Sequence, residues 1–557
     1  MQNNTMGRKV IGWAVLACVL IGTASTLQAR QAKMAAEGGN IPAVIRGTVR
    51  SPEGTPLYGI LVKAKGVGKN HSTYVFTDEK GSYDFPVLPL GAYQVSVGTA
   101  RVETVPLTAS GANQDFSGVQ LGPDFLNQTT GPNWLKAIPG SEAEKTRVAQ
   151  NCVGCHSTGR LFTNTPASPA GWARIVDRMI FDILQGRPSD WWPRHPDSPV
   201  WDHYHAKFSP ENLKALTEFL AKNITRETQN VYAAKAMMRP RGEAARAVFT
   251  EWELPSGGVG DSWPDKQGII WYLTSRPDGV GRLDPRTGEF QEWAYPDPAT
   301  KPGRFHDVWP DERGDLWITA AALNKIIKFD VRTHQFTAWD VTKDIGDYPH
   351  TGEFDQSGNF WFTLTFGDDS GVAKVDPRTG KITKFPVPTK WSYSYGLTVD
   401  KKDNVWFTEH HANKIGRIEA RTGKLREYTV PTPVALPRRI RPDSKGRVWF
   451  TASGYPGQIS MLDPETGKFS EYDYGIPNGY PYVINVDKSD KVWFNSVEGN
   501  LIGKFDPEAQ KFVLFLLPVP ETYSRETHLD FSTDPIAVVY PLGEHRRPGI
   551  GRMYVRP

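Results

Sequence analysis

Hydrophobic positions in the C-terminal half of the chain recur with a long and regular period. A tryptophan inside a short hydrophobic strand returns every 43 to 46 residues, at Trp271, Trp317, Trp361, Trp406, Trp449 and Trp493. A turn rich in Asp, Gly, Lys and Asn precedes each of these strands, and a second turn such as 376–380 follows it. Asp bonds to the backbone of such turns, and Gly accepts their positive φ. Four strands per period of this length predict the blades of a β-propeller.

The outermost strands of the repeats give the number of blades. Six such strands are predicted, at 290–295, 336–341, 382–387, 425–430, 469–474 and 512–517. The last repeat, 528–555, has no outer strand of its own and carries Val538 at the position of the tryptophan. We expect strand 249–255, at the start of the domain, to complete that repeat. The prediction is a seven-bladed ring whose closure removes two open sheet edges.

Residues 44–121 alternate between hydrophobic and polar positions in the way of β-strands. Strands are predicted at 44–49, 60–64, 83–85 and 91–97, separated by turns that contain Gly and Pro. The segment should form a small β-sandwich.

Between these two regions the pattern becomes helical. Apolar residues recur at helical spacing along 172–183, and 141–150 is rich in helix formers. A third helix should begin at 209–210, with Ser209 as its N-cap and Pro210 as its first residue. The region is therefore predicted to be a small unit of three helices.

The chemistry of this helical unit is indicated by Cys152-Val153-Gly154-Cys155-His156. Cys-x-x-Cys-His is the attachment pattern of haem c, in which the two thiols bond the porphyrin and the imidazole ligates the iron. The chain has three cysteines, so no second cysteine pair exists for a structural zinc site. A plain disulfide between Cys152 and Cys155 is the alternative.

Three helices around such a motif resemble a class I cytochrome c. The resemblance implies that a methionine on the helix after the motif is the second axial ligand, and here that helix carries Trp172 and Met179. Two alternatives stay open: Met179 is a core residue, or His203 or His205 is the ligand. Both histidines lie in an insert rich in Trp and His, 191–205. We expect this insert to cover the haem edge or to pack against another domain.

The first residues of the chain indicate export. Arg8 and Lys9 precede an apolar run, and small residues follow it. This pattern predicts a signal peptide at 1–29 and a periplasmic or secreted protein with no membrane span after cleavage. An uncleaved anchor is one alternative, and lipid attachment at Cys18 is another, although the residues before Cys18 match a lipoprotein cleavage site only loosely.

The sandwich segment resembles the carboxypeptidase regulatory-like family. The shared motifs are Gly47-Thr48-Val49, Gly54-Thr55-Pro56-Leu57, Thr77 to Tyr83 and Pro89 to Tyr93. The resemblance implies a non-catalytic accessory module.

The repeats resemble the virginiamycin B lyases, which are seven-bladed streptogramin-inactivating enzymes. Trp-Phe-Thr-Glu at 406–409 and Asn-Lys-Ile-Gly-Arg-Ile at 413–418 carry the resemblance. It implies a magnesium site and a histidine base, built from Pro-His and Trp-Phe-x-Glu positions of neighbouring blades. His350 and Glu409 match those positions, and His410 follows Glu409 directly. Where a Pro-His partner of Glu409 is expected, the chain has Ser394-Tyr395.

Polar residues converge on the axis of the predicted ring. Alignment of the repeats on the tryptophan places the following residues at two adjacent levels of a central channel: His306, His350, Tyr395, Arg438 and Tyr482, then Asp261, Asp307, Arg439 and His528. Such convergence predicts a ligand site, and a channel filled with water is the alternative. The two arginines favour an anionic ligand over a cation.

The sequence thus predicts an exported, mainly β, multidomain protein. Its expected parts are a signal peptide 1–29, linker 30–43, sandwich 44–122, linker 123–139, cytochrome c domain 140–228, linker 229–247 and propeller 248–557. The first hypothesis is electron transfer through one covalent haem to or from a periplasmic partner, with the propeller binding a substrate or partner, as in an oxidoreductase.

Two other functions remain as hypotheses. One is a magnesium-dependent streptogramin B lyase with an accessory haem domain, and the other is a redox-linked ligand-binding or sensory protein. A formal net charge of +4 on 557 residues gives no indication of a nucleic-acid partner.

Overall fold

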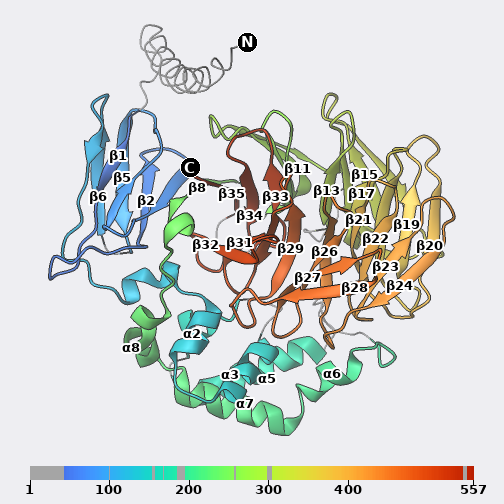
Figure 1. Ribbon diagram of the computed structural model, residues 1–557, viewed down its shortest axis with the longest axis horizontal. Helices are drawn as coiled ribbons and strands as arrows, with labels where there is room; N and C mark the ends of the chain where they lie inside the picture. The colour runs from blue at the N-terminus through green and yellow to red at the C-terminus, as the bar shows by residue number, and fades with distance from the viewer. Residues whose placement is uncertain are drawn as a thin grey trace, which may run out of the picture.

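The computed structural model describes residues 43–99, 101–152, 157–166, 168–184, 195–255, 259–297, 304–543 and 548–557. This part of the chain forms a sandwich, a helical module and a ring of strands. The sandwich lies beside the ring, and the helices lie along one face of it (Figure 1). The expected signal peptide 1–29 and residues 153–156 of the haem motif lie outside the described residues.

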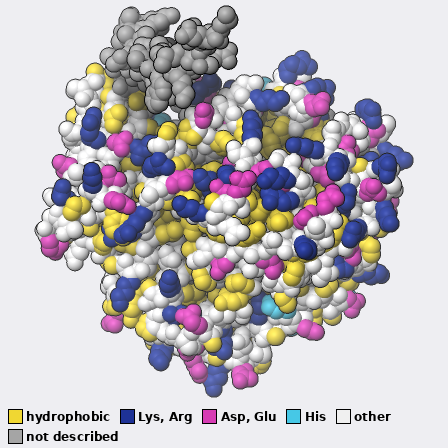
Figure 2. Space-filling view, in the orientation of Figure 1, with side chains coloured by type: hydrophobic (Ala, Val, Ile, Leu, Met, Phe, Trp, Pro, Cys, Tyr) yellow, Lys and Arg dark blue, Asp and Glu magenta, His cyan; other side chains and the backbone are white. Residues whose placement is uncertain are grey.

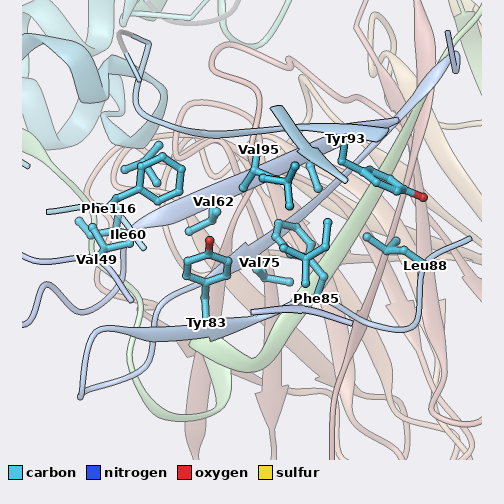
Figure 3. Packing of buried hydrophobic residues seen from close by; sticks show 14 of the residues in the cluster. Val49, Ile60, Val62, Val75, Tyr83, Phe85, Leu88, Tyr93, Val95 and Phe116 are labelled. Carbon is cyan, nitrogen blue, oxygen red and sulfur yellow. The ribbon is translucent and has the colours of Figure 1, made fainter. Parts of the chain in front are cut away.

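The N-terminal region is a sandwich of two sheets. Its strands are β1 (Ile45–Thr48), β2 (Leu61–Gly66), β3 (His71–Phe76), β4 (Ser82–Asp84), β5 (Gly91–Val97), β6 (Arg101–Leu107) and β7 (Ala112–Asn113). One sheet has the order β4-β1-β7, and the other contains β3-β2-β5-β6. Figure 3 shows Val62, Val75 and Val95 of the second sheet packed toward Tyr83 and Phe85 of the first, so the core lies between the sheets.

The second sheet of the sandwich continues into the ring. Strand β3 pairs antiparallel with β8 (Ala247–Glu253), and Thr73 lies opposite Thr250. On its other side β8 pairs with β35 of the ring, so one sheet runs β33-β34-β35-β8-β3-β2-β5-β6. The sandwich therefore covers the outer edge of the strand that closes the ring, an edge that would otherwise be open to pairing.

The ring has seven blades of four antiparallel strands, ordered from the axis outward. The first three blades are β9 (Val259–Pro264), β10 (Ile270–Ser275), β11 (Asp278–Leu283) and β12 (Phe290–Ala294); β13 (Asp307–Pro310), β14 (Leu316–Ala320), β15 (Lys325–Phe329) and β16 (Phe336–Asp340); β17 (Asp347–Phe354), β18 (Phe360–Phe366), β19 (Gly371–Val375) and β20 (Ile382–Pro386).

The remaining four blades complete the circle. They are β21 (Ser394–Val399), β22 (Val405–Glu409), β23 (Lys414–Ile418) and β24 (Leu425–Thr429); β25 (Pro437–Pro442), β26 (Val448–Ala452), β27 (Gln458–Asp463) and β28 (Lys468–Tyr472); β29 (Pro481–Val486), β30 (Val492–Ser496), β31 (Leu501–Asp506) and β32 (Lys511–Leu516); β33 (His528–Asp530), β34 (Ala537–Leu542), β35 (Gly549–Val555) and β8. Strand β8 completes the seventh blade as predicted, and β33 contacts β9 of the first blade.

Each repeated tryptophan is tied to the turn that precedes it. Its indole N–H donates to the aspartate six residues earlier, with Nε1–Oδ2 distances from 2.8 to 3.3 Å in the first six blades. The same aspartate orders its turn: Asp400 accepts the backbone N–H groups of Lys402 and Asn404. This double use explains why Asp and Trp recur together at fixed spacing.

The helical module lies between the sandwich and the ring in the sequence. Its helices are η1 (Pro123–Gln128), α2 (Gly131–Ala137), α3 (Glu142–Cys152), α4 (Arg160–Thr163), α5 (Ala170–Leu184), α6 (Trp201–Ala206), α7 (Pro210–Asn223) and α8 (Arg226–Ala236); the 3₁₀ turns η2 (Gly242–Arg246) and η3 (Ala321–Leu323) lie further along. Trp134, Trp172, Phe219 and Leu220 belong to its buried hydrophobic cluster. The Ser209 hydroxyl caps α7 by accepting the N–H of Asn212, as predicted.

Several elements escaped the sequence-based expectation. The three predicted helices correspond to α3, α5 and α7, whereas the short α2, α4, α6 and α8 were not foreseen. The expected linkers 123–139 and 229–247 contain η1, α2 and the end of α8. Strand β3 is buried along most of its length and β6 is a mostly exposed edge strand, so neither shows the alternation of a half-buried strand. Helices of these lengths do not by themselves show a class I cytochrome c domain, and that part of the expectation stays a hypothesis.

Among the described helices, none has both the length and the apolar character needed to cross a membrane.

The shared sheet predicts that the sandwich stabilises the ring. Thr73 is buried in the middle of this sheet, so Thr73→Pro should remove ladder hydrogen bonds and destabilise the protein by about 3 kcal/mol or more. Because β8 belongs to both units, the thermal transition reported by the ring's tryptophans should move down together with that of the sandwich. Thr73→Val, which keeps the backbone donor, is the matched control. Loss of the sandwich with an unchanged tryptophan transition would contradict the interpretation.

Candidate functional site

Four inner strands bring aromatic and basic side chains together at the axis of the ring. Strands β17, β21, β25 and β29 carry His350, Tyr395, Arg438 and Tyr482. The Arg438 guanidinium carbon lies 5.1 Å from the ring centre of Tyr395 and 4.7 Å from that of Tyr482. The ring centres of His350 and Tyr395 lie 4.0 Å apart, and the hydroxyls of Tyr395 and Tyr482 are hydrogen-bonded. The structure thus joins four residues that the repeat alignment placed at one level.

A threonine two residues after the repeated tryptophan sets the position of these axial residues. In the fourth blade, Thr408 Oγ1 accepts the N–H of Gly396 at 2.8 Å and donates to the carbonyl of Arg438 at 2.6 Å. Equivalent threonines donate to carbonyls of the next inner strand, as follows: Thr319 to His350, Thr363 to Tyr395 and Thr451 to Tyr482. Each hydroxyl therefore links two neighbouring blades at the level of the site.

Arg438 is held in a fixed orientation. Its Nε donates to the hydroxyl of Ser453 at 2.8 Å, and its Nη2 donates to the hydroxyl of Tyr480. The sequence analysis missed Tyr480, which comes from the loop that leads into β29. A pattern could have found it, because Tyr-x-Tyr occurs both at 393–395 and at 480–482. Tyr393 and Tyr523 belong to the same buried aromatic cluster.

Arg439 connects blades across the axis at the next level. Its Nη1 donates to Thr351, its Nη2 lies 3.4 Å from Asp307 Oδ1, and it pairs with Glu526. These partners come from the third and second blades and from the loop that enters the seventh. Burial raises the pKa of Asp307 to about 6. Thr351 and Glu526 were not among the predicted residues: Thr351 lies at the second aligned level but was not singled out, and Glu526 lies outside the two aligned positions.

A carboxylate–imidazole group lies at this same level. His528 Nε2 and Asp261 Oδ1 are 3.1 Å apart. Within the described residues, Asp261, Glu526 and His528 are the set whose ligand-type atoms all lie within 4.8 Å of one another. Burial alone would raise the pKa of Asp261, but His528 and Arg439 hold it below its ordinary value. The group of Asp261, Glu526 and His528 is thus an anionic centre, and the guanidinium of Arg439 beside it is the cation that balances it.

The axis is filled with side chains at the level of the site. Tyr395, Arg438 and Tyr482 are each at most 1% exposed, so they pack against one another and do not line an open channel. His306 lies at the edge of this layer, with its ring centre 3.7 Å from that of His350. Burial lowers the pKa of His306 to about 3 and that of His350 well below its ordinary value, so both imidazoles are neutral. At this level the structure therefore shows packed side chains and not the open central channel that we expected from the sequence.

The residues expected for lyase chemistry form no metal-ligating group in the described part of the chain. Glu409 is fully buried at the end of β22, and neither of its carboxylate oxygens has a hydrogen-bond partner among the described residues. Burial, followed by the nearby Glu427, raises its pKa to about 8. His410 Nδ1 instead faces the carbonyl of Pro437 at 3.1 Å. In the described part of the chain, His350 and Glu409 form no set of metal-ligating atoms.

The helical module covers one face of the ring, the face that carries Glu498 and Glu521. The carboxylate of Glu498 accepts the backbone N–H of Thr158 at 2.7 Å and its hydroxyl at 2.6 Å. Arg160, two residues after Thr158, pairs with Glu521 at 3.3 Å. Thr158 is fully buried, so the chain directly after the haem motif is part of the interface with the sixth blade.

The described part of the insert 191–205 also packs on the ring. The His195 ring stacks on Trp391 at 4.4 Å, and Ser198 Oγ lies 3.3 Å from Nδ1 of His411. Ser198 and His411 line a small cavity of about 40 Å³ at this junction. The described part of the insert therefore packs against another domain, as one reading of the sequence expected. His411 had not been singled out, because attention rested on the Glu409-His410 pair.

The predicted haem residues lie in or beside the module. Cys152 is the last residue of α3 and packs at the border of the module's hydrophobic cluster, whereas Cys155 and His156 lie outside the described residues. Met179, on α5, is 41% exposed and is therefore not a core residue. His203 and His205 lie on α6, where burial lowers the pKa of His203 to about 4.

Comparisons with known proteins agree with this architecture. The family model of the virginiamycin B lyases matches residues 246–504, and that of the carboxypeptidase regulatory-like domain matches 44–117. A search of curated protein sequences gives no match. The chain therefore contains a carboxypeptidase regulatory-like domain and a virginiamycin B lyase-like propeller, and neither match covers the residues between them, 118–245.

Two solved structures share the ring. Virginiamycin B lyase from Staphylococcus aureus is 21% identical, with a TM-score of 0.50, and covers 56% of this chain and 100% of its own. A streptogramin B lyase structure is 27% identical, with a TM-score of 0.50, and covers 57% of this chain and 100% of its own. The likeness concerns the propeller fold.

The burial of Glu498 at the interface with the helical module predicts a pH dependence. Burial raises the pKa of Glu498 from 4.5 to about 7, so between these values the folded chain keeps a proton that the unfolded chain loses. Stability should therefore fall as pH rises through this window. Glu498→Gln keeps an acceptor for Thr158 and should flatten the slope, gaining at most about 3 kcal/mol at neutral pH or above.

Denaturant unfolding at a series of pH values measures this effect. Glu508→Gln, on the exposed surface of the same blade, is the control and should keep the wild-type slope. A wild-type slope in Glu498→Gln would show that this carboxyl is not the titrating group.

Proposed function

We propose that the chain is an exported redox protein that carries one covalent haem c on Cys152, Cys155 and His156, and that the covered face of its propeller binds the substrate or partner. The single observation that supports this most is the place of Thr158. It follows the motif by two residues and is bonded to Glu498 of the propeller. A haem on this motif would therefore be held beside the ring.

The described residues of the module fit such a group. Cys152 ends a helix next to a buried cluster in which Trp134 and Phe162 stack at 4.8 Å. An apolar border of this kind is what a porphyrin requires around its edge. When bound, a haem with His and Met ligands accepts and releases one electron at a time. Met179 is the proposed second ligand because it is the methionine on the helix that follows the motif, with His203 and His205 as the alternatives.

The propeller would contribute binding to this function. Arg438 is cationic and nearly fully buried, and the tyrosines around it can donate hydrogen bonds, whereas Arg439 is already paired with Asp307 and Glu526. These groups suit a substrate or ligand with a carboxylate or a similar anionic group. Because the layer is closed by packing, the helical module must shift before such a molecule can reach it. A periplasmic electron donor or acceptor would then exchange electrons with the haem.

If the haem only reports ligand binding without turnover, the protein is a redox-linked sensor.

A second candidate function is streptogramin B linearisation. The family match over 246–504 and the 27% identical lyase structure favour it, and they support the propeller part of the chain more directly than they support electron transfer. The buried Glu409 and its neighbours His410 and His411 would take part in proton transfer. Magnesium is the ion that the resemblance implies, but the described residues around Glu409 and His350 do not form a metal-ligating set.

Haem attachment can be tested on purified protein. Protein produced together with a cytochrome c maturation system should carry one covalent haem, seen as a mass increase and a reducible optical spectrum. Cys152→Ser and Cys155→Ser should each remove or weaken the attachment, and Met179→Ala should change the spectrum of the oxidised form while attachment persists. Thr163→Ala, in the neighbouring helix, is the control. A full-length chain that leaves the maturation system without haem would refute the proposal.

The lyase candidate calls for a separate assay. Incubation of the chain with a streptogramin B and Mg²⁺ should give the linear product if this function is present, and Glu409→Gln should reduce the rate about 100-fold or more because a proton-transferring group is lost. Glu508→Gln, on the exposed surface of the sixth blade, is the control. The absence of any linear product from the wild-type chain would exclude this candidate.

A further inference from the structure

A cavity away from the axis of the ring carries a second candidate site. It has a volume of about 880 Å³ and lies where the sandwich, the segment before β8 and the last residues of the chain meet. A volume of this size is typical of small-molecule sites in proteins. Figure 2 shows basic and acidic side chains interleaved over the face of the molecule in view.

Three arginines line this cavity without an acidic partner. In the described part of the chain, the side chains of Arg46, Arg241 and Arg246 make no ion pair with a carboxylate, and all three are exposed. They come from different segments, Arg46 from β1 of the sandwich and the other two from the segment that leads into β8. Each guanidinium offers five N–H donors that the protein itself leaves to solvent.

The acidic residues of the cavity, by contrast, are mostly engaged. Asp84 pairs with Arg556 at 2.8 Å, and Asp115 accepts both the backbone N–H and the hydroxyl of Thr48. Asp78 accepts the backbone N–H groups of Lys80 and Ser82 within its own turn. Apart from the carboxylate of Glu79, the hydrogen-bonding capacity that remains in the cavity is therefore largely that of the arginines.

Tyr58 gives the cavity one rigid wall. Its ring lies between two guanidinium groups, with the carbon of Arg239 at 3.7 Å and that of Arg241 at 3.9 Å from the ring centre. Arg239 also donates to the carbonyl of Tyr58. This stack fixes Arg241 at the cavity wall, so less side-chain entropy is lost when it binds a ligand.

We propose that this cavity is a binding site for a small organic anion with a carboxylate or a phosphate group. Arg46, Arg241 and Arg246 bind the anionic oxygens, and Tyr58 holds Arg241 in place. The site is separate from the covered face of the propeller and does not depend on haem or on lyase chemistry.

Isothermal titration of the full chain with citrate and with pyrophosphate tests the proposal, because the two probes distinguish carboxylate from phosphate. At least one should bind with 1:1 stoichiometry and a dissociation constant below about 1 mM. The double variant Arg46→Ala/Arg246→Ala should weaken binding about tenfold or more, since charge-assisted hydrogen bonds are lost. Arg226→Ala, on exposed α8 and outside the cavity, is the control and should bind as the wild type does.

Two results would overturn the proposal. One is that neither citrate nor pyrophosphate binds with a dissociation constant below about 1 mM. The other is a double variant that binds as tightly as the wild type. Neither Arg46 nor Arg246 holds an acidic partner, so the double variant should keep the wild-type melting temperature. Arg241→Gln is a further variant, and it should weaken binding while Tyr58 remains covered by Arg239.

Discussion

The hydroxyl of a repeated threonine holds the centre of this protein in register. In blade after blade it accepts an N–H from its own inner strand and donates to a carbonyl of the next, as Thr408 does between Gly396 and Arg438. Both partners are buried backbone groups, which are costly to leave unpaired. In the sixth blade the amide of Asn495 replaces the hydroxyl and bonds Val483 and Ser524 in the same way. The positions of the axial side chains follow from these links.

The ring is not an independent unit in this chain. Strand β8 closes the seventh blade and at the same time extends the sandwich, so the N-terminal domain covers the edge at which the ring is joined. On one face of the ring, Glu498 and Glu521 bond Thr158 and Arg160, which follow the Cys-x-x-Cys-His motif in the sequence. The order of the three parts in the sequence thus corresponds to their contacts in space. A helical module between sandwich and propeller can reach the loops of the sixth blade because both flanking domains meet at β8.

The sequence was most informative where one residue type has one structural use. The tryptophan period and its preceding turn predicted the blades because the indole N–H bonds an aspartate of that turn in six of the seven blades, and the missing outer strand predicted the closure by β8. The nature of the site was harder to predict. The alignment placed His350, Tyr395, Arg438 and Tyr482 at one level, but it could not show that they pack into a closed layer under the helices. Glu526, Tyr480 and His411 lie in loops, whose positions depend on packing between blades and on the module. Strands β3 and β6 were missed because burial on both faces, or exposure, removes the alternating pattern.

The central proposal is that a covalent haem on the Cys-x-x-Cys-His motif is held beside the propeller. An anomalous difference map at the iron absorption edge, from crystals of the protein matured with haem, tests this directly. The account predicts one iron peak on the propeller side of the module, beside Thr158 and the loop that carries Glu498. An iron peak on the opposite side of the helices, away from the ring, or a motif that holds no iron in haem-matured protein, would contradict it.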